Sequence, residues 1–217
     1  MCRFILFKGE DSVLLADLLT RPAHSIINQS FDSRLRVDLH RPLNGDGFGV
    51  GWYDSYKDYS AASICSKSSK EKRESTQPCI FTSVLPAWNN PNLNRLSEKI
   101  HSRLVFCHVR AASPGFPISE TNCHPFQYGN IMFMHNGYIA DFKKIKRRLE
   151  RLLPDPIYNC MNGNTDSEFC FSVFLSLLAE PLKKAFSLNE LTEALFKTIE
   201  ILNDFSREAG IKYVKQT

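Results

Sequence analysis

The sequence has no run of apolar residues long enough to cross a membrane, and its apolar start, CRFILF at 2–7, soon meets charged residues. It also lacks a strong charge of either sign, because 27 basic and 23 acidic side chains leave a formal net charge of +4. The seven cysteines are an odd number and form no C-x-x-C pair. These absences argue against a membrane or nucleic-acid partner and an exported disulfide framework, and they favour a cytoplasmic protein.

The sequence does contain enough apolar material for a substantial core, since 43% of its 217 residues are hydrophobic. Strand-like segments lie at 2–7, 47–53, 79–84, 104–111 and 131–137. Helix-like segments lie at 13–20, 93–102, 141–153 and 188–209, and another follows residue 165. We therefore expect a single α+β domain over residues 2–217, with the polar stretch 54–78 as an exposed excursion.

Two capping boxes mark the starts of helices in the second half of the chain. Thr165-Asp-Ser-Glu168 precedes an apolar run, and Ser187-x-x-Glu190 opens a segment with helical periodicity that ends at Gly210. The glycine-rich segment GFGVGWY at 47–53 predicts a strand that another backbone or a ligand approaches closely.

Polar residues gather at predicted strand ends and in tight turns, where functional sites are usually built. These clusters are Cys2, Asn44-Gly-Asp-Gly-Phe-Gly49, His108-Val-Arg110 with Ser113, Asn122-Cys-His-Pro125, His135-Asn-Gly137 and Gly163-Asn-Thr-Asp-Ser-Glu168. Taken singly, each has an ordinary structural interpretation. A cysteine in an apolar strand is usually a small hydrophobic residue, and an Asn-Gly pair is usually a turn.

Taken together, the clusters fit the hydrolysis of an amide by an N-terminal thiol. If Met1 is removed, Cys2 carries both a thiol and an α-amine, and the amine's unperturbed pKa of ~7.7–8.0 suits a general base. The attacked carbonyl oxygen then gains negative charge. The side-chain amide of Asn136 and the backbone N–H of Gly137 offer two donors for that charge.

A glutamine-like substrate also carries an α-carboxylate and an α-ammonium group. Arg110 offers the guanidinium fork that suits a carboxylate, and Asp166 offers a carboxylate for the ammonium group. We therefore expect these two side chains to hold the amino-acid head of the substrate.

As an ordered set over residues 2–168, these motifs resemble the class II glutamine amidotransferase domains of the N-terminal nucleophile hydrolase superfamily. The resemblance implies a four-layer αββα sandwich with Cys2 as nucleophile and with Asn136 and Gly137 as the oxyanion hole. It implies that Arg110 and Asp166 bind the glutamyl head. Ser113 lies where the family often has a hydroxyl near the substrate carboxylate. No metal or other cofactor is implied.

Three further stretches narrow the resemblance, namely RPAHSIINQSFDSRLR at 21–36, RPLNGDGFGVGWY at 41–53 and PAWNNPNL at 86–93. They are similar to the amidotransferase-like subunits of the fungal DUG glutathione-degradation complex. This similarity implies cleavage of the γ-glutamyl bond of glutathione, together with a metallopeptidase-like partner subunit. Free glutamine presents the same carboxylate and ammonium groups, so a plain glutamine amidohydrolase or amidotransferase stays an alternative.

Family members usually continue beyond the helix at 188–209 into further strands of the sandwich, whereas this sequence stops after IKYVKQT. The chain is then a fragment or a shortened form, or its second sheet is completed in another way. An incomplete second sheet would favour a non-catalytic binding subunit that keeps the fold.

A metal site built from Cys107, His108, Cys123 and His124 is a further alternative, since zinc takes such ligands. Adjacent residues of a strand point to opposite faces, and the usual spacing of cysteine ligands is missing. We therefore expect no metal site.

Overall fold

The computed structural model describes residues 2–32, 43–54, 77–112, 117–178, 181–182, 185–211 and 214–215. Ser113 and residues 55–76 of the polar excursion lie outside these ranges, as do residues 33–42.

The first part of the described chain alternates between strands and short helices. The strands there are β1 (Arg3–Leu14), β2 (Phe48–Trp52), β3 (Cys79–Ser83) and β4 (His101–Val109). The helices there are α1 (Leu15–Leu19), α2 (Ile26–Phe31), α3 (Pro91–Ser97) and the 3₁₀ turn η2 (Ala87–Asn89).

The second part is more helical, as the sequence predicts. Its strands are short: β5 (Phe126–Tyr128), β6 (Ile131–Phe133), β7 (Tyr138–Ile139) and β8 (Val214–Lys215). Its helices are η3 (Glu120–Asn122), α4 (Lys143–Leu152), α5 (Asp155–Tyr158), α6 (Asp166–Ser176) and α7 (Leu188–Glu208).

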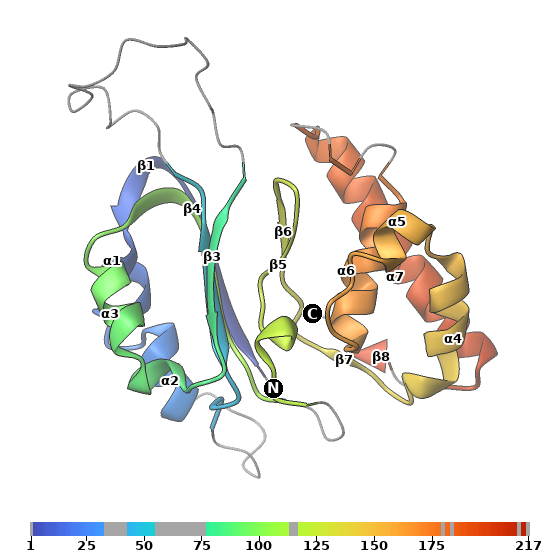
Figure 1. Cartoon of the computed structure of the whole chain (residues 1–217), viewed down its shortest axis with the longest axis horizontal. Helices are drawn as coiled ribbons and strands as arrows, with labels where there is room; N and C mark the ends of the chain where they lie inside the picture. The colour runs from blue at the N-terminus through green and yellow to red at the C-terminus, as the bar shows by residue number, and fades with distance from the viewer. Residues whose placement is uncertain are drawn as a thin grey trace.

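Four layers follow one another across the molecule (Figure 1). Helices α1–α3 cover one face of an antiparallel sheet with the strand order β1-β4-β2-β3. The β5–β6 hairpin lies on the other face, and α4–α7 form the layer beyond it. The predicted α+β class and αββα layering are thus confirmed. The second β layer is thin, because the described ranges give it only the two-stranded pairs β5–β6 and β7–β8.

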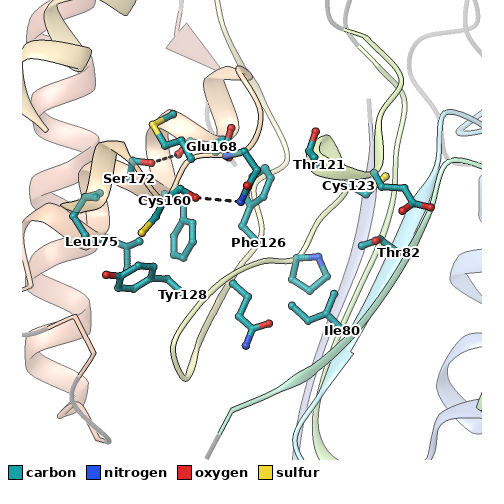
Figure 2. Close-up of a pocket in the computed structure, with 17 residues that line it drawn as sticks. Ile80, Thr82, Thr121, Cys123, Phe126, Tyr128, Cys160, Glu168, Ser172 and Leu175 are labelled. Atoms are coloured by element: carbon teal, nitrogen blue, oxygen red, sulfur yellow. Dashed lines mark hydrogen bonds between the residues drawn. The ribbon is translucent and has the colours of Figure 1, made fainter. Parts of the chain in front are cut away.

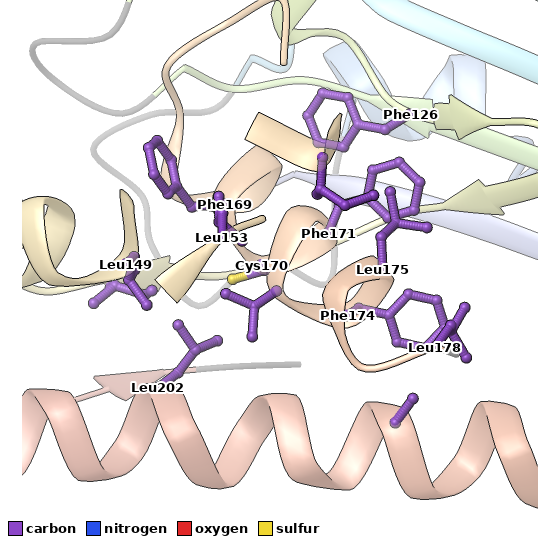
Figure 3. Packing of buried hydrophobic residues seen from close by; sticks show 14 of the residues in the cluster. Phe126, Leu149, Leu153, Phe169, Cys170, Phe171, Phe174, Leu175, Leu178 and Leu202 are labelled. Atoms are coloured by element: carbon purple, nitrogen blue, oxygen red, sulfur yellow. The ribbon is translucent and has the colours of Figure 1, made fainter. Parts of the chain in front are cut away.

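Each helical layer has its own apolar core. Between the sheet and α1–α3 lie side chains such as Leu19, Val50 and Val105. The other core surrounds α6, which is buried on nearly every side between α4, α7 and the hairpin. Figure 3 shows Leu149 and Leu202 packing toward α6 from these neighbouring helices. Because α6 is packed on nearly every side, its N-terminal turn is held in place, and that turn carries Asp166.

Two glycines of β2 let the hairpin segment lie directly on the sheet. A Cβ atom at Gly49 would overlap the backbone carbonyl of His124, and one at Gly51 would lie 2.9 Å from Cγ of Pro125. The prediction that another backbone approaches this strand is confirmed. Because the approaching chain includes His124, the glycines also set how closely the His124 segment lies on the sheet.

The predicted helix at 13–20 is wrong at its start. Strand β1 continues to Leu14, where Val13 and Leu14 pair with Ser102 and His101 of β4, and α1 begins only at Leu15. Pairing with a strand far away in the sequence therefore outweighs the local helical pattern.

The two predicted capping boxes differ in the structure. At Ser187 both hydrogen bonds of the box are present. At Thr165 only the first is made, because the hydroxyl accepts from the Glu168 N–H at 3.2 Å while the Glu168 carboxylate binds the N–H groups of Asn162 and Gly163. Although α7 is 21 residues long, neither it nor any other helix in the described ranges is apolar enough to cross a bilayer.

Candidate functional site

Strands β1 and β4 bring Cys2 next to the end of the HVRA motif. Because the strands are antiparallel with Arg3 opposite Val109, Cys2 lies beside the residues that follow β4. The Ala111 N–H donates to Sγ of Cys2 at 3.3 Å, and Sγ lies 3.6 Å from the Ala111 carbonyl, to which it donates. Cys2 is half-buried. The thiol is therefore held at a strand end rather than packed in the apolar core.

The surroundings of Cys2 favour the neutral thiol. Burial raises its pKa above the ordinary value, and the negative charge of Asp46 adds to the rise. The Ala111 N–H, the positive amino terminus and Arg110 act in the opposite direction without reversing it. Since only the thiolate is a strong nucleophile, reaction at this sulfur requires a base that removes the proton.

Arg110 places a buried positive charge beside the thiol. Its side chain follows β4 and is 5% exposed, and both terminal nitrogens donate to the Pro117 carbonyl at 3.3 Å. No carboxylate of the described residues forms an ion pair with it. A buried guanidinium whose charge has no partner in the described chain is suited to an anionic ligand.

A turn in the NGDGFG motif fastens the segment that carries Arg110. The Asp46 N–H donates to the Arg110 carbonyl at 3.2 Å, and the Arg110 N–H donates to the Gly47 carbonyl at 2.9 Å. Gly47 has a φ of 104°, and a Cβ there would lie 2.8 Å from Sγ of Cys123. Only glycine fits this turn.

The second group of candidate residues lies at the N-terminus of α6. Asp166, 6% exposed, accepts the Ile139 N–H at 2.8 Å through Oδ2 and the Ser167 N–H at 2.9 Å through Oδ1. Nδ1 of His135 and the hydroxyl of Ser167 lie 2.8 Å apart and share a hydrogen bond. A carboxylate offers about four acceptor positions, so Asp166 keeps capacity for a ligand ammonium group.

These contacts position the Asn136-Gly137 turn. His135 before the turn is hydrogen-bonded to Ser167, and Ile139 after the turn is hydrogen-bonded to Asp166, the first residue of α6. Asn136 and Gly137 are half-buried, and the Asn136 amide makes no side-chain hydrogen bond to another described residue. The amide donor therefore stays available.

Three buried histidines lie between the two groups. The ring centroids of His108 and His124 are 4.3 Å apart, and the surroundings of His108 also include the charge of Arg110 and the ring of His135. Burial lowers the pKa of His108 to about 3, and it lowers the pKa of His124 and of His135 as well. All three rings are therefore neutral near pH 7, and none has the pKa expected of a general base.

The structure thus brings Cys2 together with Arg110, and Asn136 and Gly137 together with Asp166. His108 joins the two groups, since its surroundings include both Arg110 and His135. Cys2 and Asn136 do not hydrogen-bond to each other. Ser113 lies outside the described residues.

Sequence reasoning missed the structural roles of Asp46, Ser167 and the Pro117 carbonyl. Asp46 stands inside the NGDGFG motif and Ser167 inside the capping box, so both were visible as parts of turns. Their partners lie 66 and 32 residues away in the chain, and no local pattern indicates such contacts.

The four candidate metal ligands are not gathered at one point. Cys107 belongs to the core beneath α1–α3, whereas His108 lies on the opposite face of β4 against His124. Within the described ranges, no group of three or more histidine, cysteine or acidic side chains could hold a metal ion.

A cavity of about 370 Å³ lies between β3 and α6. Figure 2 shows Thr82 and Cys123 on its sheet side and Ser172 and Leu175 on its helix side. Its described lining includes the carboxylates of Glu120 and Glu168 but no basic side chain. Among the described residues, this cavity therefore offers a ligand carboxylate no cationic side chain.

Comparison with known proteins shows what the chain is similar to. The family model for class II glutamine amidotransferases matches residues 16–208. The chain is 48% identical to a protein of Saccharomyces cerevisiae named "Probable glutamine amidotransferase DUG3", over 97% of this chain and 56% of that protein.

A second relative comes from Mycolicibacterium smegmatis and is named "Gamma-glutamyl-hercynylcysteine sulfoxide hydrolase". It is 27% identical over 64% of this chain and 52% of its own length. The chain thus spans about half the length of these two relatives.

Among solved structures, a glutamine aminotransferase class-II domain protein from Silicibacter pomeroyi superposes with a TM-score of 0.59 at 25% identity. The match covers 96% of this chain and 66% of that one. The match therefore covers nearly the whole chain, including most of the strands and helices around the two groups of site residues.

Proposed function

Since the chain belongs to the class II glutamine amidotransferases, an enzyme family, we propose that it hydrolyses the amide bond of a γ-glutamyl group with Cys2 as nucleophile. The observation that carries this proposal is the Cys2 thiol, hydrogen-bonded to Ala111 and placed beside the buried guanidinium of Arg110. Removal of Met1 is part of the proposal, because the α-amine of Cys2 then becomes available as the base.

The α-amine is the base that the surroundings of the thiol favour. The neutral thiol has to lose a proton, and the three nearby histidines have pKa values lowered by burial. The free α-amine of Cys2 has an unperturbed pKa of ~7.7–8.0 and needs no further residue to position it. It takes the thiol proton and later gives a proton to the leaving amine.

The substrate's glutamyl head lies between the two groups of site residues in this proposal. Arg110 binds the α-carboxylate, Asp166 binds the α-ammonium group, and Ser113 adds a hydroxyl near the carboxylate. The thiolate attacks the γ-carbonyl carbon, and the oxyanion accepts hydrogen bonds from Asn136 and Gly137. The C–N bond then breaks, the amine leaves with the proton, and water hydrolyses the thioester to release glutamate and free Cys2.

Glutathione is the substrate we propose, with a metallopeptidase-like subunit as partner. The sequence resemblance and the 48% identity to a protein named DUG3 support this choice. A relative named as a γ-glutamyl conjugate hydrolase supports a leaving group larger than ammonia. We also propose a cytoplasmic location, which agrees with the free thiols of Cys2, Cys79, Cys107, Cys123, Cys160 and Cys170.

Hydrolysis of free glutamine is the second candidate. Arg110 and Asp166 recognise groups that glutamine and glutathione share, and the yeast relative is itself named a glutamine amidotransferase. Discrimination between the two substrates therefore depends on the leaving-group side.

Glutamate release from glutathione and from glutamine, each with and without the metallopeptidase-like subunit, tests the proposal. We expect glutathione to be cleaved in the presence of the partner, and a Cys2→Ala chain as matched control to release no glutamate. Ammonia from glutamine without cleavage of glutathione would establish the second candidate instead. No glutamate from either substrate, with Met1 shown by mass spectrometry to be absent, would contradict both and indicate a non-catalytic subunit.

A further inference from the structure

Asp46 holds the chain segment that contacts the candidate nucleophile. Its backbone N–H donates to the Arg110 carbonyl at 3.2 Å, and its Oδ2 accepts the Ala112 N–H at 2.8 Å. These two bonds lie on either side of Ala111. One residue of the NGDGFG turn thus brackets the residue whose N–H and carbonyl both contact Sγ of Cys2.

The turn that makes these two hydrogen bonds has little freedom to shift. The next residue, Gly47, accepts the Arg110 N–H through its carbonyl and adopts a φ of 104°. There is no room for a side chain at Gly47, because a Cβ there would lie 2.8 Å from both Sγ of Cys123 and the carbonyl oxygen of Ser83. The turn that carries Asp46 is therefore packed against the sheet and against the Cys123 segment.

We propose that Asp46 is a positioning residue for the nucleophile, which it orients through Ala111 while holding the backbone of Arg110 beside the thiol. This inference rests on the proposed function, since it concerns the same sulfur. Asp46 acts here through its hydrogen bonds, because the Ala112 N–H occupies Oδ2 and Ala111 lies between the two bonded groups and contacts Sγ. Neither proton transfer nor substrate binding is assigned to it.

The charge of Asp46 acts on the thiol in a way that can be separated from its hydrogen bonds. The charged groups that act on Cys2 are the amino terminus and Arg110, which lower its pKa, and Asp46, which raises it. Removing the charge alone should make the thiol easier to deprotonate. Removing the hydrogen bond should misplace it. The two effects on reactivity therefore have opposite signs.

Two variants separate the effects. In Asp46→Asn the amide oxygen still accepts the Ala112 N–H, whereas Asp46→Ala loses the acceptor. We expect Asp46→Ala to lower kcat for glutamate release by about 10- to 100-fold, the cost of a misplacement of roughly 1 Å. We expect Asp46→Asn to keep most of the wild-type kcat. The pH midpoint of Cys2 alkylation by iodoacetamide should fall in both variants and stay fixed in Asp17→Asn, which removes an exposed carboxylate on α1.

Three results would overturn the inference. They are wild-type kcat in Asp46→Ala, equal loss of kcat in both variants, and an unchanged alkylation midpoint in Asp46→Asn. Circular dichroism checks that each variant is folded, and if Asp46→Ala is not, the kcat and midpoint of Asp46→Asn decide. Absence of glutamate release in the wild type would contradict the proposed function, whereas the alkylation midpoint would still report on Asp46.

Discussion

Replacement of Cys2 with alanine is expected to abolish glutamate release from every γ-glutamyl amide while the chain stays folded. The loss should reduce kcat to below about 10⁻³ of the wild-type value, because no other group can form the covalent intermediate. Folding should survive, since the half-buried Sγ has hydrogen bonds only to Ala111 among the described residues and lies outside both apolar cores. Steady-state assay and thermal unfolding measure the two effects separately.

Cys2→Ser is the matched control, since its hydroxyl keeps a donor and an acceptor beside Ala111 but is a much weaker nucleophile at neutral pH. We expect it to resemble Cys2→Ala in activity and the wild type in unfolding temperature. Turnover retained in Cys2→Ala would remove the sulfur from the mechanism. A collapse of the unfolding temperature in both variants would instead assign Cys2 a structural role.

Replacement of Arg110 should have the second largest effect, and it should act on substrate binding. Truncating one partner of a buried, hydrogen-bonded charge pair costs about 2–5 kcal/mol, so Arg110→Ala should lower kcat/KM by roughly 30-fold to a few thousandfold. Arg110→Lys keeps the charge but loses the planar fork, and we expect an intermediate value. In both variants a raised KM should account for most of the change.

Arg110 also donates to the Pro117 carbonyl, so its replacement could act by releasing that segment. Asn122→Ala controls for this effect, because Nδ2 of Asn122 donates to the same carbonyl at 3.1 Å. If Asn122→Ala raised KM as much as Arg110→Ala does, the effect would belong to the Pro117 segment and the assignment of Arg110 to the substrate carboxylate would fall.

Local patterns in the sequence predicted those parts of the fold that local physics determines. Short apolar segments, one of them glycine-rich, indicated the cores of β2, β3 and β4, and Thr165 and Ser187 marked the starts of α6 and α7. The close approach at Gly49 was also visible, because a glycine inside a strand usually marks a bulge or a point where another backbone or a ligand comes near.

Contacts between distant segments could not be predicted in this way. The register of Arg3 opposite Val109 extends β1 through the expected helix start, and it also places Cys2 beside Ala111. The bonds from Asp46 to Ala112 and from Ser167 to His135 exist only once the sheet and α6 are assembled. The site's residue types were therefore visible in the sequence, whereas the contacts that hold them in position were not.

The proposed mechanism depends above all on a covalent bond between Cys2, freed of Met1, and the γ-glutamyl group. Mass spectrometry of the N-terminal peptide after acid quenching of a turnover reaction detects this bond. We predict a peptide that begins at Cys2 and carries a γ-glutamyl thioester on Sγ. Unmodified Cys2, or Met1 still attached, in a preparation that releases glutamate would contradict the mechanism.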